Sequence, residues 1–282
     1  MRKILLSLFL LSGIMASAAI RVTDVKGEPL PYAALKVVDR PIGVLTDSLG
    51  IGTLPEGVRL TDTIDISFPG YKSERKTFAD LTRSGCVSLE NKGIPLQNVT
   101  VKPGKFKRVV KGKKHAHGIF VATMDSAEGY WTGLEFKAGE GKKHLLTKVG
   151  FYHMDFMDWK PMQRMKFRIQ IFDMKDVTSD PTDRMIAVGE PIYFEYVRSE
   201  NEDDNGKFTF TLPDPIALPD HALVAIQPLH RIHGEYWMYK CNVIGKRCWT
   251  MDIDDPYWEK MPFAHPYFVE CMKLKVKKKG TV

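Results

Sequence analysis

The N-terminal part of the chain alternates short apolar runs with polar turns. Residues 32–38 are apolar apart from Lys36, and they follow the turn-forming sequence Pro29-Leu30-Pro31. In residues 62–68, apolar side chains at positions 64, 66 and 68 alternate with polar ones at 63, 65 and 67. That alternation is typical of a half-buried strand. Short strands separated by frequent turns predict a small all-β sandwich.

The turns between these runs carry a recognisable set of motifs. They are Asp24 and Gly27, Pro29-Leu30-Pro31-Tyr32-Ala33, Thr46-Asp47-Ser48-Leu49-Gly50, and the spaced residues Ile64, Ile66, Ser67, Gly70 and Tyr71. In this order, over about residues 20–90, the chain resembles the carboxypeptidase regulatory-like domain, and residues 94–101 resemble the segment that often follows it. The resemblance implies a seven-stranded transthyretin-like sandwich without an active site. Such domains are common in bacterial envelope proteins, including TonB-dependent transporters.

The C-terminal part of the chain is also patterned as strands. The predicted strands are 164–171, 192–196, 207–212, 222–226 and 267–276. Residues 222–226 are apolar throughout, which suits a strand covered on both faces. In the last strand we expect Phe268, Met272, Leu274 and Val276 to point inward. No amphipathic helix of about twelve residues is evident. These features predict a jelly-roll-like β-sandwich, similar in pattern to galactose-binding-like domains.

The first eighteen residues have the pattern of a secretory signal. Basic residues are followed by an apolar run and then by Ala16-Ser17-Ala18, a small-residue cleavage site. The apolar run is too short for a stable membrane span, and no second run follows. No cysteine stands near the cleavage site, so a lipoprotein is not expected. We expect a periplasmic, cell-surface or secreted protein with no integral membrane span after cleavage.

Charge and composition suggest how the chain is divided. The net charge is +7, and residues 102–114 hold many lysines and no acidic residue. We therefore predict a signal peptide at 1–18, the regulatory-like sandwich at 19–92, a basic linker at 93–117 and the jelly-roll-like sandwich at 118–282. The basic segment is either a solvated linker or a contact for acidic lipid head groups or polyanionic glycans. Export excludes nucleic acid as a partner.

No catalytic motif is present, and no cofactor is expected. The histidines lack the spacing of a carboxypeptidase zinc site, and no nucleophile elbow occurs. Residues 201–206 imitate half of an EF-hand loop, but a strand pattern follows them, so we expect a solvated hairpin tip with a tight Asn205-Gly206 turn. Two readings of Asp252, Asp254 and Asp255 stay open. They could ligate a structural calcium or form a turn before Pro256.

Cysteines and aromatic residues supply the remaining candidates. Cys241 and Cys248 enclose a plausible turn and are candidates for a disulfide in an oxidising compartment, whereas Cys86 is expected to be buried. Rings crowd the C-terminal third, and the candidate ligand-binding residues are Trp237, Tyr239, Trp249 and Trp258. Exposed rings suit sugar recognition, and the alternative is that they fill the core. Trp258, beside two charged residues, is expected to be exposed.

Three functions follow from this pattern. The first is a non-catalytic exported envelope protein that binds a glycan or an envelope partner, or helps an assembly form. The second is a carbohydrate-active hydrolase on the C-terminal sandwich, because a catalytic carboxylate pair can come from distant strands. The third is an accessory to a TonB-dependent nutrient-uptake system.

Overall fold

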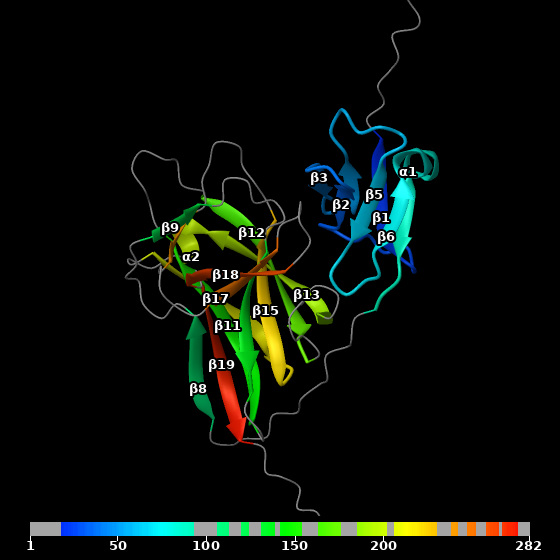
Figure 1. Ribbon diagram of the computed structural model, residues 1–282. Helices are drawn as coiled ribbons and strands as arrows, with labels where there is room; N and C mark the ends of the chain where they lie inside the picture. The colour runs from blue at the N-terminus through cyan, green and yellow to red at the C-terminus, as the bar shows by residue number, and fades with distance from the viewer. Residues whose placement is uncertain are drawn as a thin grey trace, which may run out of the picture. The chain divides into compact units, whose positions relative to one another are not determined.

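The computed structural model describes residues 18–92, 106–112, 120–123, 131–138, 142–153, 163–175, 185–201, 206–229, 238–241, 247–251, 258–264 and 267–275. The chain forms two compact units. The first comprises the described residues up to Ile66 together with Ser73–Leu89, and the second comprises Ser67–Lys72 and the described residues from Glu90 onward. Both are built from β-strands, which confirms the all-β prediction (Figure 1). The predicted signal peptide lies almost entirely outside the described residues.

The first unit contains two sheets and one short helix. Its elements are β1 (Ala19–Asp24), β2 (Ala34–Val37), β3 (Gly43–Leu45), β4 (Ile51–Thr53), β5 (Thr63–Ser67), β6 (Glu74–Thr77), α1 (Phe78–Ser84) and β7 (Cys86–Leu89). The strand orders are β4-β1-β7 and β3-β2-β5-β6. The strands predicted at 32–38 and 62–68 are confirmed by β2 and β5. Whether this unit is transthyretin-like stays a prediction.

The turn at residues 46–50 forms as its sequence predicts. The Asp47 carboxylate accepts hydrogen bonds from the backbone N–H groups of Leu49 and Ile51 at 2.8 and 2.9 Å. Gly50 has φ of 72°, and a Cβ there would lie 2.6 Å from the carbonyl oxygen of Val22. Only glycine therefore fits this turn without moving β1.

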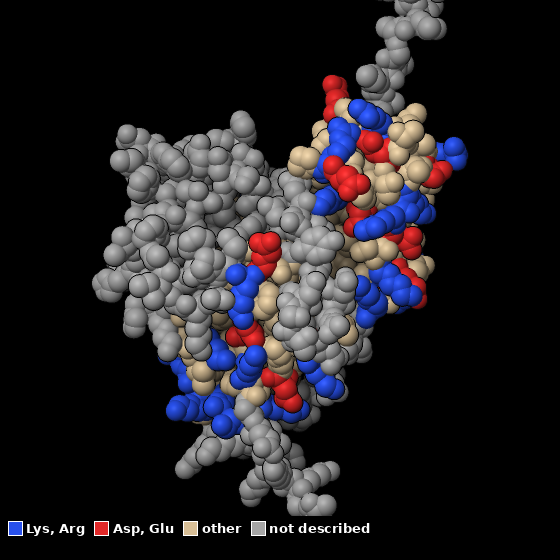
Figure 2. All heavy atoms as spheres, in the orientation of Figure 1, with Lys and Arg blue, Asp and Glu red and all other residues tan. Residues whose placement is uncertain are grey.

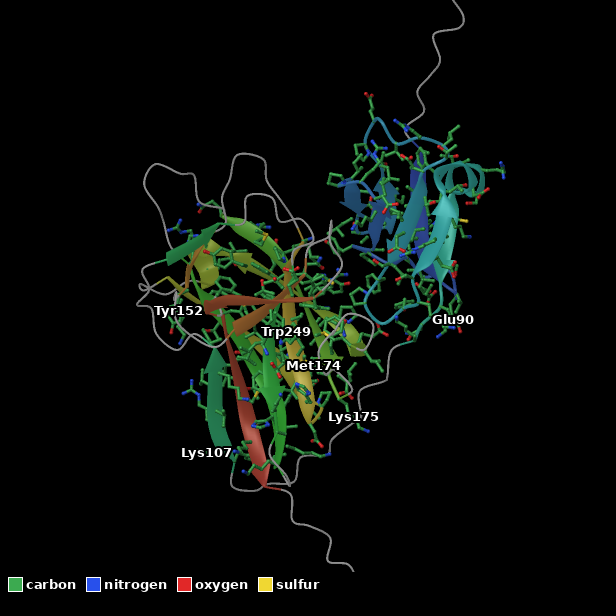
Figure 3. All side chains as sticks on the ribbon, viewed as in Figure 1. Glu90, Lys107, Tyr152, Met174, Lys175 and Trp249 are labelled. Atoms are coloured by element: carbon green, nitrogen blue, oxygen red, sulfur yellow. The ribbon has the colours of Figure 1, made fainter. Side chains whose placement is uncertain are left out.

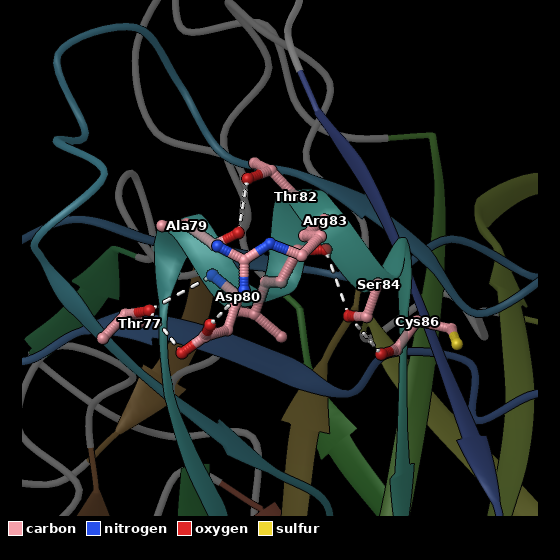
Figure 4. A network of polar contacts seen from close by, with 8 residues as sticks. Thr77, Ala79, Asp80, Thr82, Arg83, Ser84 and Cys86 are labelled. Carbon is pink, nitrogen blue, oxygen red and sulfur yellow. Dashed lines mark hydrogen bonds and ion pairs between the residues drawn. The ribbon is translucent and has the colours of Figure 1, made fainter.

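Helix α1 was not predicted, and its ends are fixed by local side chains (Figure 4). Thr77 caps the N-terminus by accepting a hydrogen bond from the Asp80 N–H, and Gly85 ends the helix in the left-handed conformation. Leu81 is the buried anchor. A helix of seven residues is too short to give a periodic signal, which is why the apolar pattern missed it.

The second unit contains thirteen described elements. They are β8 (Lys107–Gly112), β9 (Phe120–Thr123), β10 (Trp131–Lys137), β11 (Lys142–Tyr152), β12 (Arg164–Asp173), β13 (Ile186–Val197), α2 (Arg198–Asn201), β14 (Lys207–Ala217), β15 (His221–Pro228), β16 (Met238–Cys241), β17 (Arg247–Met251), β18 (Glu259–Ala264) and β19 (Tyr267–Lys275). Six strands form a sheet in the order β13-β12-β15-β10-β17-β18, and four form a sheet in the order β14-β11-β19-β8. Strands β9 and β16 pair separately.

The two larger sheets share one hydrophobic core. Residues from β10, β12, β13 and β15 meet residues from β11, β14 and β19 in it. Phe208 lies at its centre, with its ring centroid 4.7 Å from that of Phe151 and 5.7 Å from that of Phe194. Strand β15 is covered on both faces, as predicted, because Val224 faces this core and Leu223 faces a second cluster.

The basic segment is not a connector throughout. Within the predicted linker, Lys107–Gly112 form β8 and pair antiparallel with β19, so that Val109 lies opposite Cys271. Strand β8 is at the edge of its sheet. Lysine is tolerated on edge strands, where its charge also discourages pairing with another chain. The high lysine content therefore hid a strand.

The strands on either side of the acidic segment do not form the predicted hairpin. Strands β13 and β14 do not pair with each other. They belong to different sheets and form the outer edges of those sheets. The connection between them includes α2 and thus crosses from one sheet to the other. Gly206, with φ of 72°, does adopt the turn conformation expected of it.

The predicted facing of the last strand is wrong. Tyr267, Val269 and Cys271 point into the core between the sheets, and Phe268 lies on the opposite face. There Phe268 occupies the space left by Gly150, whose Cβ would lie 2.4 Å from the Phe268 ring. Both faces of this strand carry apolar residues, so polarity alone did not fix the register.

The exposure of Cys86 differs from the expectation that it is buried, and thiol labelling can test it directly. Cys86 is exposed, because it precedes the inward-facing Val87 on β7, whereas Cys271 is fully buried. Burial raises the pKa of the Cys271 thiol to about 12, although the nearby charge of Lys111 opposes this. At about pH 8, iodoacetamide should modify Cys86 in the native protein and Cys271 only after unfolding, as read by mass spectrometry. Equal labelling rates would show that the second unit opens readily.

Candidate functional site

The outer face of the six-stranded sheet carries a group of polar side chains beside aromatic ones. Along β10, Leu134 and Phe136 point into the core between the sheets. Successive side chains alternate, so Trp131, Glu135 and Lys137 point to the other face. On this outer face the carboxylate of Glu135 meets the imidazole of His221 and the indole of Trp249.

Four strands bring their side chains to Glu135. His221 on β15 places its Nε2 2.8 Å from Oε1 of Glu135, and Trp249 on β17 donates from its indole N–H to Oε2 at 3.3 Å. Lys137 on β10 and Lys260 on β18 place their Nζ atoms 3.2 and 3.5 Å from the carboxylate. We call these five residues the Glu135 cluster. Figure 3 labels Trp249 within the second unit.

The Glu135 cluster combines two largely buried hydrogen-bond donors with two more exposed cations. Lys260 also lies over the Trp249 ring, 4.9 Å from its centroid, so that the ring is bounded by a cation on one face. The side chains of Glu135 and His221 are 19% and 21% exposed, whereas those of Lys260 and Lys137 are 41% and 70% exposed. The carboxylate is therefore held by the sheet and covered from the solvent side by flexible lysines.

The surroundings keep Glu135 ionised. Burial alone would raise the pKa of this carboxyl group. Hydrogen bonds from His221, Trp249 and Lys137, together with the charge of Lys260, outweigh burial and lower its pKa from 4.5 to about 2. Glu135 is thus a strong acceptor and a weak proton donor at neutral pH.

The depressed pKa predicts how Glu135→Gln changes stability with pH. Because the pKa of Glu135 is lower in the folded than in the unfolded chain, its stabilisation is present above about pH 4.5 and is lost as the pH falls toward 2. The variant should be less stable by about 1–2 kcal/mol at neutral pH, since the carboxylate is partly exposed, and the difference should vanish in acid. Urea unfolding at several pH values measures this. A deficit independent of pH would contradict it.

Two of the four aromatic candidates are buried in a second cluster on the same face. Trp249 and Trp258 pack in it with Trp131 and Phe172, and the ring centroid of Trp258 is 5.6 Å from that of Phe172. The expectation that Trp258 is exposed is therefore wrong, because only 5% of it reaches solvent. Successive side chains of an extended chain point to opposite faces, so the charge of the next residue, Glu259, does not indicate that Trp258 is exposed.

Several predicted site residues lie outside the described part of the chain. Trp237, Asp252, Asp254 and Asp255 are among them, and so is the side chain of Tyr239, whose backbone belongs to β16. The calcium alternative is thus untested there, and in the described residues no cluster of three or more His, Cys, Asp or Glu could hold a metal ion.

The disulfide candidate also stays a prediction. Cys248 is buried on β17, and the side chain of its proposed partner Cys241 on β16 is not described. The two strands belong to different sheets. Among the described helices, none has the length and apolar character to cross a membrane.

Comparisons with known proteins give no assignment. No family model and no curated protein matches the chain. Two similar solved structures are of infectious bursal disease virus, from the Gx and Gt strains, each with 10% sequence identity. They cover 86% and 88% of this chain, with TM-scores of 0.20 and 0.22, and this chain spans 63% and 65% of theirs. TM-scores this low support neither a shared fold nor a shared function.

Proposed function

We propose that this protein is a non-catalytic, exported binding protein of the bacterial envelope that recognises a carbohydrate at the Glu135 cluster. The export pattern at the N-terminus and the resemblance of the first unit to a regulatory-like domain support the envelope location. The observation that carries the proposal is an ionised, partly exposed carboxylate held beside a tryptophan by fixed donors.

The chemistry of the cluster suits hydroxyl groups. A sugar presents hydroxyl donors, which match the Glu135 carboxylate as an acceptor. The Trp249 ring is only 8% exposed and has Lys260 over one face, so it holds the carboxylate through its N–H group and offers little surface for stacking. Glu135 offers the acceptor, and the flexible side chains of Lys137 and Lys260 can move aside or donate to ring oxygens. His221 and Trp249 keep the carboxylate in one orientation, so little ordering is needed on binding.

The same geometry argues against the hydrolase alternative. A general acid or base works best with a pKa near the working pH, and the pKa of Glu135, at about 2, is far below it. A glycosidase nucleophile would need a second carboxyl group nearby. In the described residues, the groups that contact Glu135 are all donors or cations.

A glycan array followed by calorimetry tests the proposal. The mature protein should bind at least one glycan class, and Glu135→Gln should weaken that binding by roughly tenfold or more, since a hydrogen bond to a charged group is lost. The matched control is Glu195→Gln, which makes the same charge change on the same sheet at an exposed ion pair with Arg164. It should leave affinity unchanged.

Two results would overturn the proposal. One is glycan binding that is the same in the wild type and in Glu135→Gln. The other is release of reducing sugar from the bound glycan in a parallel hydrolysis assay, which would favour the hydrolase.

A further inference from the structure

A row of basic side chains crosses three neighbouring strands of the four-stranded sheet. Lys107 on β8 lies directly opposite Lys273 on β19, and Lys273 lies directly opposite His144 on β11. Directly opposed residues on antiparallel strands have Cβ atoms about 4.5–5.5 Å apart. The register therefore brings three basic groups together from segments far apart in the sequence.

The row belongs to the face that lines the space between the two sheets. It continues the positions of Cys271 and Leu146, which are core residues on β19 and β11. His144 is 95% buried and packs edge-on against Phe136, at 6.2 Å between ring centroids. Lys111 on β8 lies over the same Phe136 ring, with its Nζ 4.4 Å from the ring centroid. The basic row thus runs from the exposed Lys107 to the buried His144 ring.

Three of the nearby lysines carry a charge with no partner in the part of the chain that the structure describes. Lys107, Lys142 and Lys273 have no acidic partner among the described residues. The buried acid Glu270 lies on the opposite face of β19, in an ion pair with Arg108 at 2.6 Å. Like charges directly opposite one another destabilise a sheet. Burial and the charges of Lys111, Lys273 and Lys142 lower the pKa of His144, so its ring is neutral at pH 7. In Figure 2, Lys and Arg gather at one end of the second unit.

We propose that Lys107, Lys111, Lys273 and His144 form a binding site for an oxyanion, the sulfate or phosphate ester of a soluble anionic polymer. The site is independent of the carbohydrate site at Glu135, which lies on the other sheet. Two or more ammonium groups converge on one anion, and the His144 ring supplies a hydrogen bond from the buried side. A bound anion would offset the repulsion between the directly opposed Lys107 and Lys273.

Protection of the edge strand β8 against pairing with another chain explains only part of this arrangement. Lysine on an edge strand discourages pairing with another chain. That role accounts for Lys107 and Lys111 on β8, but Lys273 and His144 lie on strands inside the sheet. Adsorption to a membrane would involve the exposed lysines alone and would give no role to the buried His144.

Titration with sodium sulfate, against sodium chloride at matched ionic strength, tests the site by NMR of the histidine rings. Sulfate should shift the His144 ring signals saturably and raise the pKa of His144, because the anion favours its protonated form. Lys273→Gln and Lys107→Gln should each weaken sulfate binding by about tenfold. The matched control, Lys143→Gln, removes the same charge from the opposite face of β11 and should bind sulfate as the wild type does.

Further titrations identify the source of the anion. Dextran sulfate should compete with inorganic sulfate at His144. The proposal is overturned if sulfate causes no saturable shift, or if Lys143→Gln weakens binding as much as Lys273→Gln does. It is also overturned if vesicles of phosphatidylglycerol bind while sulfate and dextran sulfate do not, since that pattern is adsorption to a charged surface.

Discussion

Phe208→Ala should destabilise the second unit by about 3–5 kcal/mol. Phe208 is buried in the core, where its ring stacks on Phe151 and Phe194 and meets the Tyr196 ring edge-on. Removing the ring deletes its contacts with both sheets and leaves a cavity that the surrounding strands cannot fill by small shifts. All five tryptophans lie in the second unit, so urea unfolding followed by tryptophan fluorescence reports this unit directly.

The matched control for this core prediction is Tyr193→Ala. Tyr193 lies on β13 in the same unit but is exposed, so its truncation should change the free energy of unfolding by less than about 1 kcal/mol. A loss of stability as small in Phe208→Ala as in Tyr193→Ala would show that the two sheets do not share a tightly packed core.

Thr46→Val should destabilise the first unit by about 2–4 kcal/mol, although the two side chains have nearly the same shape. The buried Thr46 hydroxyl accepts a hydrogen bond from the Ala33 N–H at 2.9 Å and donates one to the Leu30 carbonyl at 2.7 Å. Valine leaves both backbone groups buried without a partner, and each carries a desolvation cost. Hydrogen exchange read by mass spectrometry on peptides from residues 19–66 measures this stability.

The Thr46→Ser variant distinguishes the contribution of the hydroxyl group to stability from that of the methyl group. Serine keeps both hydrogen bonds and should retain most of the protection of the first unit, at a cost of about 1 kcal/mol for the lost methyl group. If serine and valine were equally destabilising, packing of the methyl group would outweigh the hydrogen bonds. Tryptophan fluorescence should report the same unfolding midpoint in both variants, since the second unit is untouched.

Strands with two chemically different faces could be predicted from the sequence. Residues 165, 167, 169 and 171 of β12 point into the core as their alternation indicates. In β19 both faces are apolar, so the alternation gave no unique facing and the assignment was wrong. The edge strand β8 was hidden by lysines, which a covered strand would not tolerate.

The candidate site could not be predicted because its members are distant in sequence. Glu135 and Trp131 share a face by simple alternation along β10, and that signal was present in the sequence. His221 and Trp249 are 86 and 114 residues from Glu135, and they meet it only because β15 and β17 flank β10 in the sheet. Local patterns carry no information on that strand order.

NMR titration of the mature protein, with the glycan selected on the array, tests the recognition site most directly. The indole N–H of Trp249 donates to Glu135, and the His221 ring contacts the same carboxylate. The proposed site predicts saturable shifts of both signals, which disappear in Glu135→Gln. Saturable glycan binding that leaves the Trp249 and His221 signals unmoved would contradict it.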